Sequence, residues 1–399
     1  MATHLLAAAA GAALLASTGI AAANGLRAAV DAAWERAGLG PTLAAREAQV
    51  EARERVLDSA FPKSPTVGFA YRRDLWTNPL GKRELEPELA FPLWASGERD
   101  ALRAVTGTER GALEPAAAAT RLRVAGQVRE SLWALAMARV ELDAAQARVE
   151  AARVLEADVA RRVAAGELPR ADLLLAQVDL LDARSTLAQA SSVHAGTVHE
   201  WRSLTGLDPA GADPEPRPAG AGQDSHPELR DRAARVTVAM AQLAQAREVR
   251  RDGPELSIST RHDRDARGLA ERDTIRVGIR IPLDTEARNA PRIAAAGSAL
   301  ADVESEYARE RLRLEAERRR ADEADRAAEA RRALAEERRR IAEQNLVLID
   351  RAFRLGERPL ADLLRARALR DDAALEEARS QARIGLARAR LNQASGVLP

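Results

Sequence analysis

Residues 166–174 read Gly-Glu-Leu-Pro-Arg-Ala-Asp-Leu-Leu, and residues 356–364 read Gly-Glu-Arg-Pro-Leu-Ala-Asp-Leu-Leu. The second stretch follows the first at a fixed offset (166 to 356), and the same offset carries Pro92 onto Pro282. Positions that match at one offset over such a length indicate one structural unit used twice. The sequence therefore predicts a duplicated fold.

The composition indicates long helices. Alanine, arginine, glutamate and leucine dominate the 399 residues, and only 3% of the residues are aromatic. Acidic and basic residues nearly balance, with a formal charge of +1, which argues against a nucleic-acid partner. The chain has no cysteine, so disulfides, thiolate metal sites and cysteine nucleophiles are excluded.

The N-terminal sequence is typical of an exported protein. Residues 5–16 form an apolar run, and the small residues 21–23 follow it, so we predict a signal peptide at residues 1–23. The region before the run holds His4 and no Lys or Arg, so an uncleaved membrane helix is the alternative. The run is short for a membrane span, however, and no later segment resembles a transmembrane helix.

Two segments alternate strictly between apolar and polar residues, at 85–93 and 275–283. Such alternation predicts strands with one apolar and one polar face. A shorter alternating run precedes each segment, at 67–71 and 256–260, so each copy is predicted to supply one hairpin. The apolar faces include Leu85, Leu89, Phe91, Ile275, Val277, Ile279 and Ile281. The polar faces include Glu84, Glu86, Glu88, Thr274, Arg276 and Arg280.

Helices account for most of the remaining sequence. Residues 98–165 contain one proline, Pro115, and residues 292–356 contain none, so each copy can form a helix of about 60 residues, roughly 90 Å long. Leucine and valine recur at steps of seven within 128–149 and 173–187, which is the spacing of a coiled-coil seam. Shorter helices are predicted at about 26–59 and 227–251. Proline-rich residues 208–227 are predicted to join the copies as a loop or linker.

The apolar strand faces suggest where the protein resides. An edge hairpin on a soluble core is the usual alternative, but the helices have narrow seams and cannot cover these faces. Strands of about ten residues with this alternation match an outer-membrane barrel, in which lipid covers the apolar face. Four strands cannot close a barrel, because closure needs about eight. Three chains would supply twelve strands, so a homotrimer is predicted.

The repeated turn lies where one antiparallel helix ends and the next begins. Glycine suits a left-handed C-cap, and proline suits the first turn of the next helix. Asp172 and Asp362 lie near the positive end of that helix. On these residues alone the motif is the turn of an αα-hairpin, in which two antiparallel helices are joined by a short loop.

Together these features resemble the TolC-like outer-membrane efflux channel family over nearly the whole mature chain. The residues that carry the resemblance are the paired hairpins and turns, Phe91-Pro92-Leu93, Ile281-Pro282-Leu283 and the closing stretch 391–396. The resemblance implies an α+β membrane protein. Its duplicated long helices would form an α-helical coiled-coil barrel, and its β-hairpins a trimeric 12-stranded outer-membrane β-barrel.

The resemblance also implies a function and partners. The chain would be the outer-membrane channel component of a tripartite efflux system, which extends into the periplasm. It would act as a passive exit duct for metal ions or drugs. The implied partners are a periplasmic adaptor, a proton-driven inner-membrane efflux pump and outer-membrane lipid. Residues 285–290 resemble members that serve heavy-metal efflux pumps.

By the same resemblance, the two turns form the periplasmic tip. Adaptor docking falls on Ala165, Gly166, Glu167, Leu355, Gly356 and Glu357. Tip gating falls on Asp172, Arg358, Asp362 and Arg365. Asp172 and Arg358 are a candidate ion pair, within one chain or between neighbours. Phe353 lies where a hydrogen-bonding tyrosine would contribute to closure. Arg365 stands where some relatives have an inward carboxylate, which argues against a cation-binding ring at this tip.

The predicted organisation is a signal peptide (1–23), a first repeat (24–209), a linker (210–227) and a second repeat (228–399). No catalytic constellation is visible, so we expect neither enzyme activity nor a cofactor. His194 and His199 are five residues apart, which does not stack ligands on a helix, so no metal site is expected.

Two other interpretations share some of these features. The arginine clusters 318–320 and 338–340 are embedded among glutamates, which favours a solvated or channel-lining helix face over a DNA-binding basic region. A soluble periplasmic or cytosolic coiled-coil scaffold would share the helices. Neither a basic-region coiled coil nor a scaffold requires two amphipathic hairpins.

Overall fold

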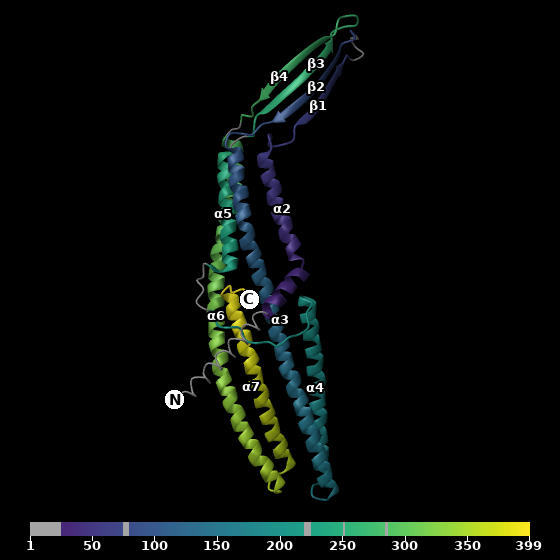
Figure 1. Cartoon of the computed structure of the whole chain (residues 1–399), viewed down its shortest axis with the longest axis vertical. Coiled ribbons are helices and arrows are strands. Elements are labelled where there is room, and N and C mark those ends of the chain that lie inside the picture. Colours follow the sequence, from purple (N-terminus) through teal and green to yellow (C-terminus); the bar gives the residue numbers. More distant parts are fainter. Residues whose placement is uncertain (1–24, 75–79, 219–224, 250–251, 284–285) are drawn as a thin grey trace, which may run out of the picture. The chain divides into compact units, whose positions relative to one another are not determined.

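The computed structural model describes residues 25–74, 80–218, 225–249, 252–283 and 286–399. The predicted signal peptide and Thr285 therefore lie outside the described residues. Residues 25–36 are helical. The elements labelled in Figure 1 are α2 (Leu39–Asp58), β1 (Thr66–Arg73), β2 (Arg83–Pro92), α3 (Glu98–Ala164), α4 (Arg170–Thr205), α5 (Pro227–Glu248), β3 (Glu255–Arg264), β4 (Arg272–Arg280), α6 (Glu286–Arg354) and α7 (Leu360–Ala394).

The chain forms two compact units, and each draws on both copies of the repeat. Unit 1 comprises Met1–Gly40, Ala118–Pro227 and Leu312–Pro399, and unit 2 comprises Pro41–Ala117 and Glu228–Arg311. The long helices α3 and α6 contribute residues to both units. The repeat therefore describes the order of elements along the chain, whereas each unit combines matching parts of the two copies.

The long helices agree with the prediction, at 67 residues for α3 and 69 for α6. Among the described residues, no helix is long and apolar enough to cross a membrane. Two helix boundaries differ from the prediction. Helix α6 starts at Glu286, so Pro291 lies inside it at the cost of one backbone hydrogen bond. The helix predicted at 26–59 is interrupted at Gly38, whose φ of 64° is the left-handed conformation that ends a helix.

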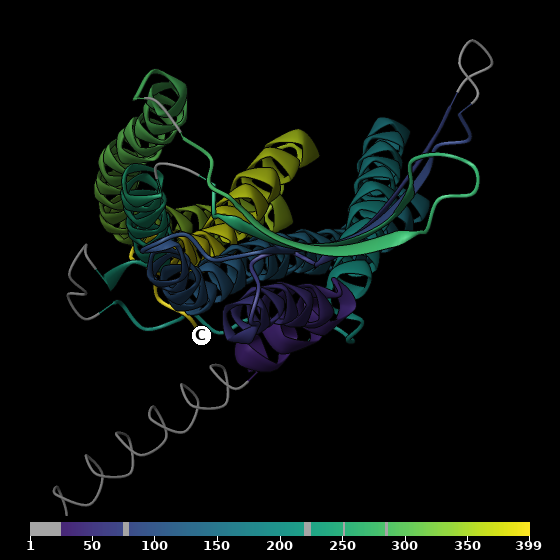
Figure 2. The same cartoon turned by 90° about the horizontal axis from the view of Figure 1, so that it is seen from above.

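The four strands form one antiparallel sheet in the order β1-β2-β3-β4. The pairs β1–β2 and β3–β4 are the two predicted hairpins, and β2–β3 joins one copy to the other. The sheet is visibly curved (Figure 2). Strand β4 ends at Arg280, so Ile281 lies beyond it, just before a proline that has no N–H to donate to a neighbouring strand.

In unit 1 the helices are neighbours in the order α6-α7-α3-α4. Arg339 of α6 contacts Glu377 of α7 at 2.6 Å. Trp133 of α3 packs on α7 in one apolar cluster, and Leu180 of α4 packs on α3 in another. Alanines fill much of these seams and allow the helices to approach closely. Leu135 and Leu142, part of the predicted seven-residue repeat in α3, are buried.

A charged side chain is buried beside the segment that joins the two copies. Arg129 of α3 is almost fully buried and binds Glu215 through two nitrogens, at 2.9 and 2.7 Å. It also donates to Gln393 Oε1 at 2.8 Å and to the carbonyl of Val397 at 3.0 Å. The burial cost of this guanidinium is thus offset by a carboxylate and two neutral acceptors.

The same segment continues across the neighbouring helices of unit 1. Asn392 of α7 donates to the carbonyl of Pro216 at 3.0 Å, and Arg217 lies 3.3 Å from the fully buried carboxylate of Asp325 in α6. We call residues 214–218 the strap. Its consecutive residues 215, 216 and 217 bind α3, α7 and α6 in turn, so part of the predicted linker is an ordered element of the fold.

Candidate functional site

The two turns that begin at Gly166 and Gly356 have the same backbone. Both glycines have positive φ, at 78° and 76°. The N–H of Glu167 donates to the carbonyl of Arg162 at 2.9 Å, and the N–H of Glu357 donates to that of Ala352 at 2.9 Å. These are the bonds of a glycine-capped helix end. A Cβ at either glycine would meet no atom within 4 Å, so the backbone conformation, and not crowding, requires glycine.

The structure brings the two turns together over one apolar cluster. Its buried members come from four helices: Leu155, Val159, Ala176, Phe353, Leu360 and Leu363. We call this the turn cluster. Phe353 lies under the guanidinium of Arg162, which is 5.0 Å from the ring centroid, a cation–π contact from one copy to the other. Phe353 was predicted at the tip, but Arg162 was not, because no local pattern distinguishes this arginine from the many others.

The predicted gating charges lie beside the turn cluster. Asp362 accepts from Arg358 at 3.2 Å and from Arg365 at 2.7 Å. Asp172 and Arg358 line the same cavity of about 360 Å³, which lies between the two turns. In this single chain Arg358 is therefore paired within its own turn, and the proposed Asp172–Arg358 pair stays a prediction. The predicted docking residues all lie exposed on the two turns: Ala165, Gly166, Glu167, Leu355, Gly356 and Glu357.

In unit 2 the sheet exposes most of its apolar face. The register places Val67 beside Leu89, Leu89 beside Ile258, and Ile258 beside Val277, which makes one continuous face across four strands. Of the seven residues predicted to face lipid, six are exposed: Leu85, Leu89, Ile275, Val277, Ile279 and Ile281. The seventh, Phe91, is half-buried against Phe61, with ring centroids 5.5 Å apart.

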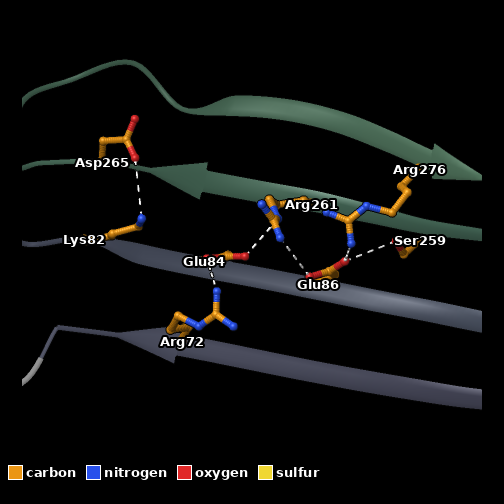
Figure 3. A network of polar contacts seen from close by, with 8 residues as sticks. All are labelled: Arg72, Lys82, Glu84, Glu86, Ser259, Arg261, Asp265 and Arg276. Atoms are coloured by element: carbon orange, nitrogen blue, oxygen red, sulfur yellow. Dashed lines mark hydrogen bonds and ion pairs between the residues drawn. The ribbon is translucent and has the colours of Figure 1, made fainter.

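The opposite face of the sheet carries a network of ion pairs (Figure 3). Glu84 of β2 binds Arg72 of β1 at 3.1 Å and Arg261 of β3 at 2.8 Å. Glu86 of β2 binds Arg276 of β4 at 2.9 Å and Arg261 at 3.4 Å. The four strands are thus linked by charge across their polar face. The sequence analysis placed Glu84, Glu86 and Arg276 on this face but did not identify their partners.

Two apolar stripes on the edge helices of unit 1 were missed. On α6 three exposed side chains fall at steps of seven, Leu334, Ile341 and Leu348, and Leu355 continues the series just beyond the helix end. On α4 three exposed side chains fall on one face: Leu174, Val178 and Leu181. A seven-residue step is the spacing of a coiled-coil seam, yet neither stripe is covered within the chain. The signal was present in the sequence, and a count of apolar positions along α6 would have found it.

In the part of the chain that the structure describes, no three His, Cys, Asp or Glu side chains are grouped so that they could hold a metal ion. What the sheet and the two turns offer chemically is a charged face, an apolar face and a pair of exposed helix turns.

Comparison with known proteins identifies the fold. No family model and no curated protein matches the sequence. The CmeC outer-membrane channel of Campylobacter jejuni matches with a TM-score of 0.73 at 15% identity, covering 93% of this chain and 85% of CmeC. CusC, a protein described as forming a transmembrane channel, matches at 0.75 and 14%, covering 94% and 92%. The outer-membrane protein VceC of Vibrio cholerae matches at 0.72 and 16%, covering 94% and 96%.

The chain therefore has the fold of the TolC-like outer-membrane channels, over nearly its whole length. The resemblance inferred from the repeated turns and hairpins is confirmed at the level of the fold. At identities near 15%, the residues that carry function are not transferred by these matches and must be argued from the chain itself.

Proposed function

We propose that this protein is the outer-membrane channel component of a tripartite efflux system, and that it acts as a passive exit duct. The observation that carries the proposal is the four-stranded sheet, which has one continuous exposed apolar face and one charged face. Such a sheet suits a barrel wall with lipid outside and water inside. The shared fold with outer-membrane channels supports the same conclusion.

The native unit in this proposal is a homotrimer in the outer membrane. Four strands leave β1 and β4 as open edges, and three chains would close these edges into twelve strands. The apolar stripes on α4 and α6 lie on the two edge helices of unit 1, so the same closure would pair α6 of one protomer with α4 of the next. Two separate surfaces thus support the proposal of further copies of the chain.

The two turns are proposed as the end that docks a periplasmic adaptor, which in turn connects the channel to an inner-membrane pump. Their six exposed residues surround backbone that no side chain covers at the glycines. Such bare backbone allows close approach of a partner hairpin. Asp172, Arg358, Asp362 and Arg365 are proposed to control closure of this end. The duct would carry metal ions or drugs that its pump delivers.

Membrane extraction and native mass measurement test the channel and its assembly. We expect detergent-dependent recovery from the outer membrane and a mass of three chains in mild detergent. The double variant Ile341→Glu/Leu348→Glu should weaken the trimer, because it places charges in the proposed seam. A stable monomer with full β content, or a soluble elongated oligomer, would overturn the proposal.

Adaptor docking is tested at the turns. Gly166→Trp and Gly356→Trp should block adaptor binding while the barrel still assembles. Gly196→Trp is the matched control, because Gly196 lies within α4 and also has open space at its Cβ position. Unchanged adaptor binding and efflux in both turn variants, at normal protein levels, would place the docking end elsewhere.

A further inference from the structure

The polar face of the sheet carries equal numbers of positive and negative residues. By alternation and register, the basic members are Arg72, Arg261, Arg272, Arg276 and Arg280. The acidic members are Glu84, Glu86, Glu88, Glu255 and Asp263. A charge count alone would therefore make this face neutral.

The acidic and the basic side chains of this face differ in their solvent exposure. The carboxylate side chains of Glu84 and Glu86 are only 6% and 19% exposed. The arginines Arg72, Arg276 and Arg280 are 74%, 60% and 76% exposed. The acids therefore lie low against the sheet, and most of the guanidinium groups stand above them.

Side-chain length and one hydrogen bond explain this layering. The glutamate side chain is shorter than that of arginine and stays closer to the sheet. Ser259 Oγ lies 3.2 Å from a carboxylate oxygen of Glu86 and holds it down further. The longer arginine side chain bridges to the carboxylate and still reaches into the space above it.

The upper layer retains donors for a solute. A guanidinium has five N–H donors, and the ion pairs of Arg72, Arg276 and Arg280 use one nitrogen each. Both oxygens of Glu84 and of Glu86 are occupied, by Arg72, Arg276, Arg261 and Ser259. The other acidic residues, Glu88, Glu255 and Asp263, are half-buried, whereas four of the five arginines are exposed. A solute above the face therefore meets N–H groups before it meets carboxylate oxygens. Confinement inside a barrel would strengthen the resulting potential.

We infer that the polar face of the sheet is an anion-attracting lining, so that the exit of this channel favours anionic organic solutes over free metal cations. The inference rests on the proposed function, because the face acts on solutes only if it lines a lumen. Of the two substrate classes named in that proposal, metal ions and drugs, the inference favours organic molecules with a negative charge. Carboxylate- or phosphate-bearing molecules match the paired N–H donors of arginine.

The experiment exploits the absence of cysteine from the chain. A single Thr274→Cys change places a thiol on the polar face, between Arg272 and Arg276 on β4. The full-length trimer in liposomes is treated with a negatively or a positively charged methanethiosulfonate of similar size. The two labelling rates are compared after each is divided by the rate with a small free thiol.

We expect the anionic reagent to react faster, on the order of five- to tenfold at low ionic strength, with the preference falling as salt screens the face. Arg276→Gln and Arg280→Gln in this background should bring the ratio toward one. Arg331→Gln, which removes an exposed arginine of α6, should leave it unchanged. Equal rates, a cation preference, or a ratio unaffected by removal of Arg276 and Arg280 would overturn the inference.

A second thiol separates this inference from the proposed function. Val277→Cys lies on the apolar face and should be unreactive to both water-soluble reagents in the membrane. If Val277→Cys reacts and Thr274→Cys does not, the faces are reversed and both proposals fail. If Thr274→Cys reacts without a charge preference while Val277→Cys is protected, the barrel stands and only the anion-attracting lining is wrong.

Discussion

The two turns have the same backbone conformation but differ in which of their side chains are buried. Position 168 is leucine in the first copy and its equivalent, 358, is arginine. Position 170 is arginine and exposed, whereas its equivalent Leu360 is fully buried in the turn cluster. Glycine and proline determine the turn conformation in both copies. The residue after the proline is buried in the turn cluster only in the second copy, where it is leucine. Duplication has preserved the path of the chain, while each copy has acquired its own chemistry.

The largest difference between the copies should appear in the turn cluster. Leu360→Ala removes a fully buried side chain and should destabilise unit 1 by about 2–5 kcal/mol. Arg170→Ala, at the matching exposed position, should change stability by less than about 0.5 kcal/mol. Thermal unfolding in detergent, followed by circular dichroism and by proteolysis at the turns, measures both. Similar losses for the two variants would mean that the copies contribute equally to the cluster.

The strands offer a second comparison, because Leu89 and Ile279 occupy equivalent positions in the two copies. If both face lipid, Leu89→Arg and Ile279→Arg should each cost about 2–4 kcal/mol of barrel stability. Arg280→Gln, on the opposite face, should mainly alter conductance. Denaturant titration of the folded barrel in lipid vesicles gives the stabilities. A loss for Arg280→Gln as large as that for Ile279→Arg would contradict the assignment of faces.

The glycines of the turns should behave alike, because their backbones are alike. Gly166→Ala and Gly356→Ala should each cost about 1–2 kcal/mol, since an L-residue is strained at positive φ and neither site is crowded. Gly196→Ala should have the opposite sign, about 1 kcal/mol stabilising, because alanine is the better residue within a helix. Amide hydrogen exchange at the helix ends resolves the three effects. A clear difference between the two turn variants would show that contacts, and not φ, dominate there.

The smallest effect concerns exposed ion pairs on the long helices. A hydrogen bond from Arg153 lowers the pKa of Glu150 in α3, and one from Arg340 lowers the pKa of Glu337 in α6. A glutamate with a lowered folded pKa stabilises the fold above its unfolded pKa and loses this contribution as the pH falls through the folded value. Helicity should therefore decrease slightly as the pH is lowered from about 5 toward 3.

This pH dependence should be of similar size in the two copies, because both pairs are exposed. Glu150→Gln and Glu337→Gln should each remove part of it, as followed by circular dichroism across that range. A pH profile unchanged by both substitutions would show that these pairs contribute nothing measurable.

Periodicity in the sequence predicted the hairpins, the faces of the strands and the long helices, because alternation and seven-residue steps place apolar side chains on one face of an element. Contacts between distant charges were not predictable in the same way. Arg129 and Arg162 look like every other arginine in the chain, and their partners depend on which helices become neighbours. The break at Gly38 was missed because the helical pattern continues on both sides of it.

The positions of the two turns were predicted correctly, because glycine and proline mark them, and the roles of their residues stay predictions. The Asp172–Arg358 pair was not observed in the single chain, where Arg358 reaches Asp362, one helical turn away. Local partners at a spacing of four compete with any contact between turns, and sequence alone gives no measure of that competition. The charged network of the sheet required the register of all four strands before its pairs became visible.

The acceptors of Arg129 bear on how the protein is made. Glu215 follows Arg129 by 86 positions, and Gln393 and Val397 follow it by 264 and 268. When residues 24–209 have been synthesised, none of the residues that bind the Arg129 side chain has yet been made. Its burial is strongly unfavourable until those residues arrive. We therefore expect a chain that ends before residue 215 to leave the region around Arg129 open to proteases.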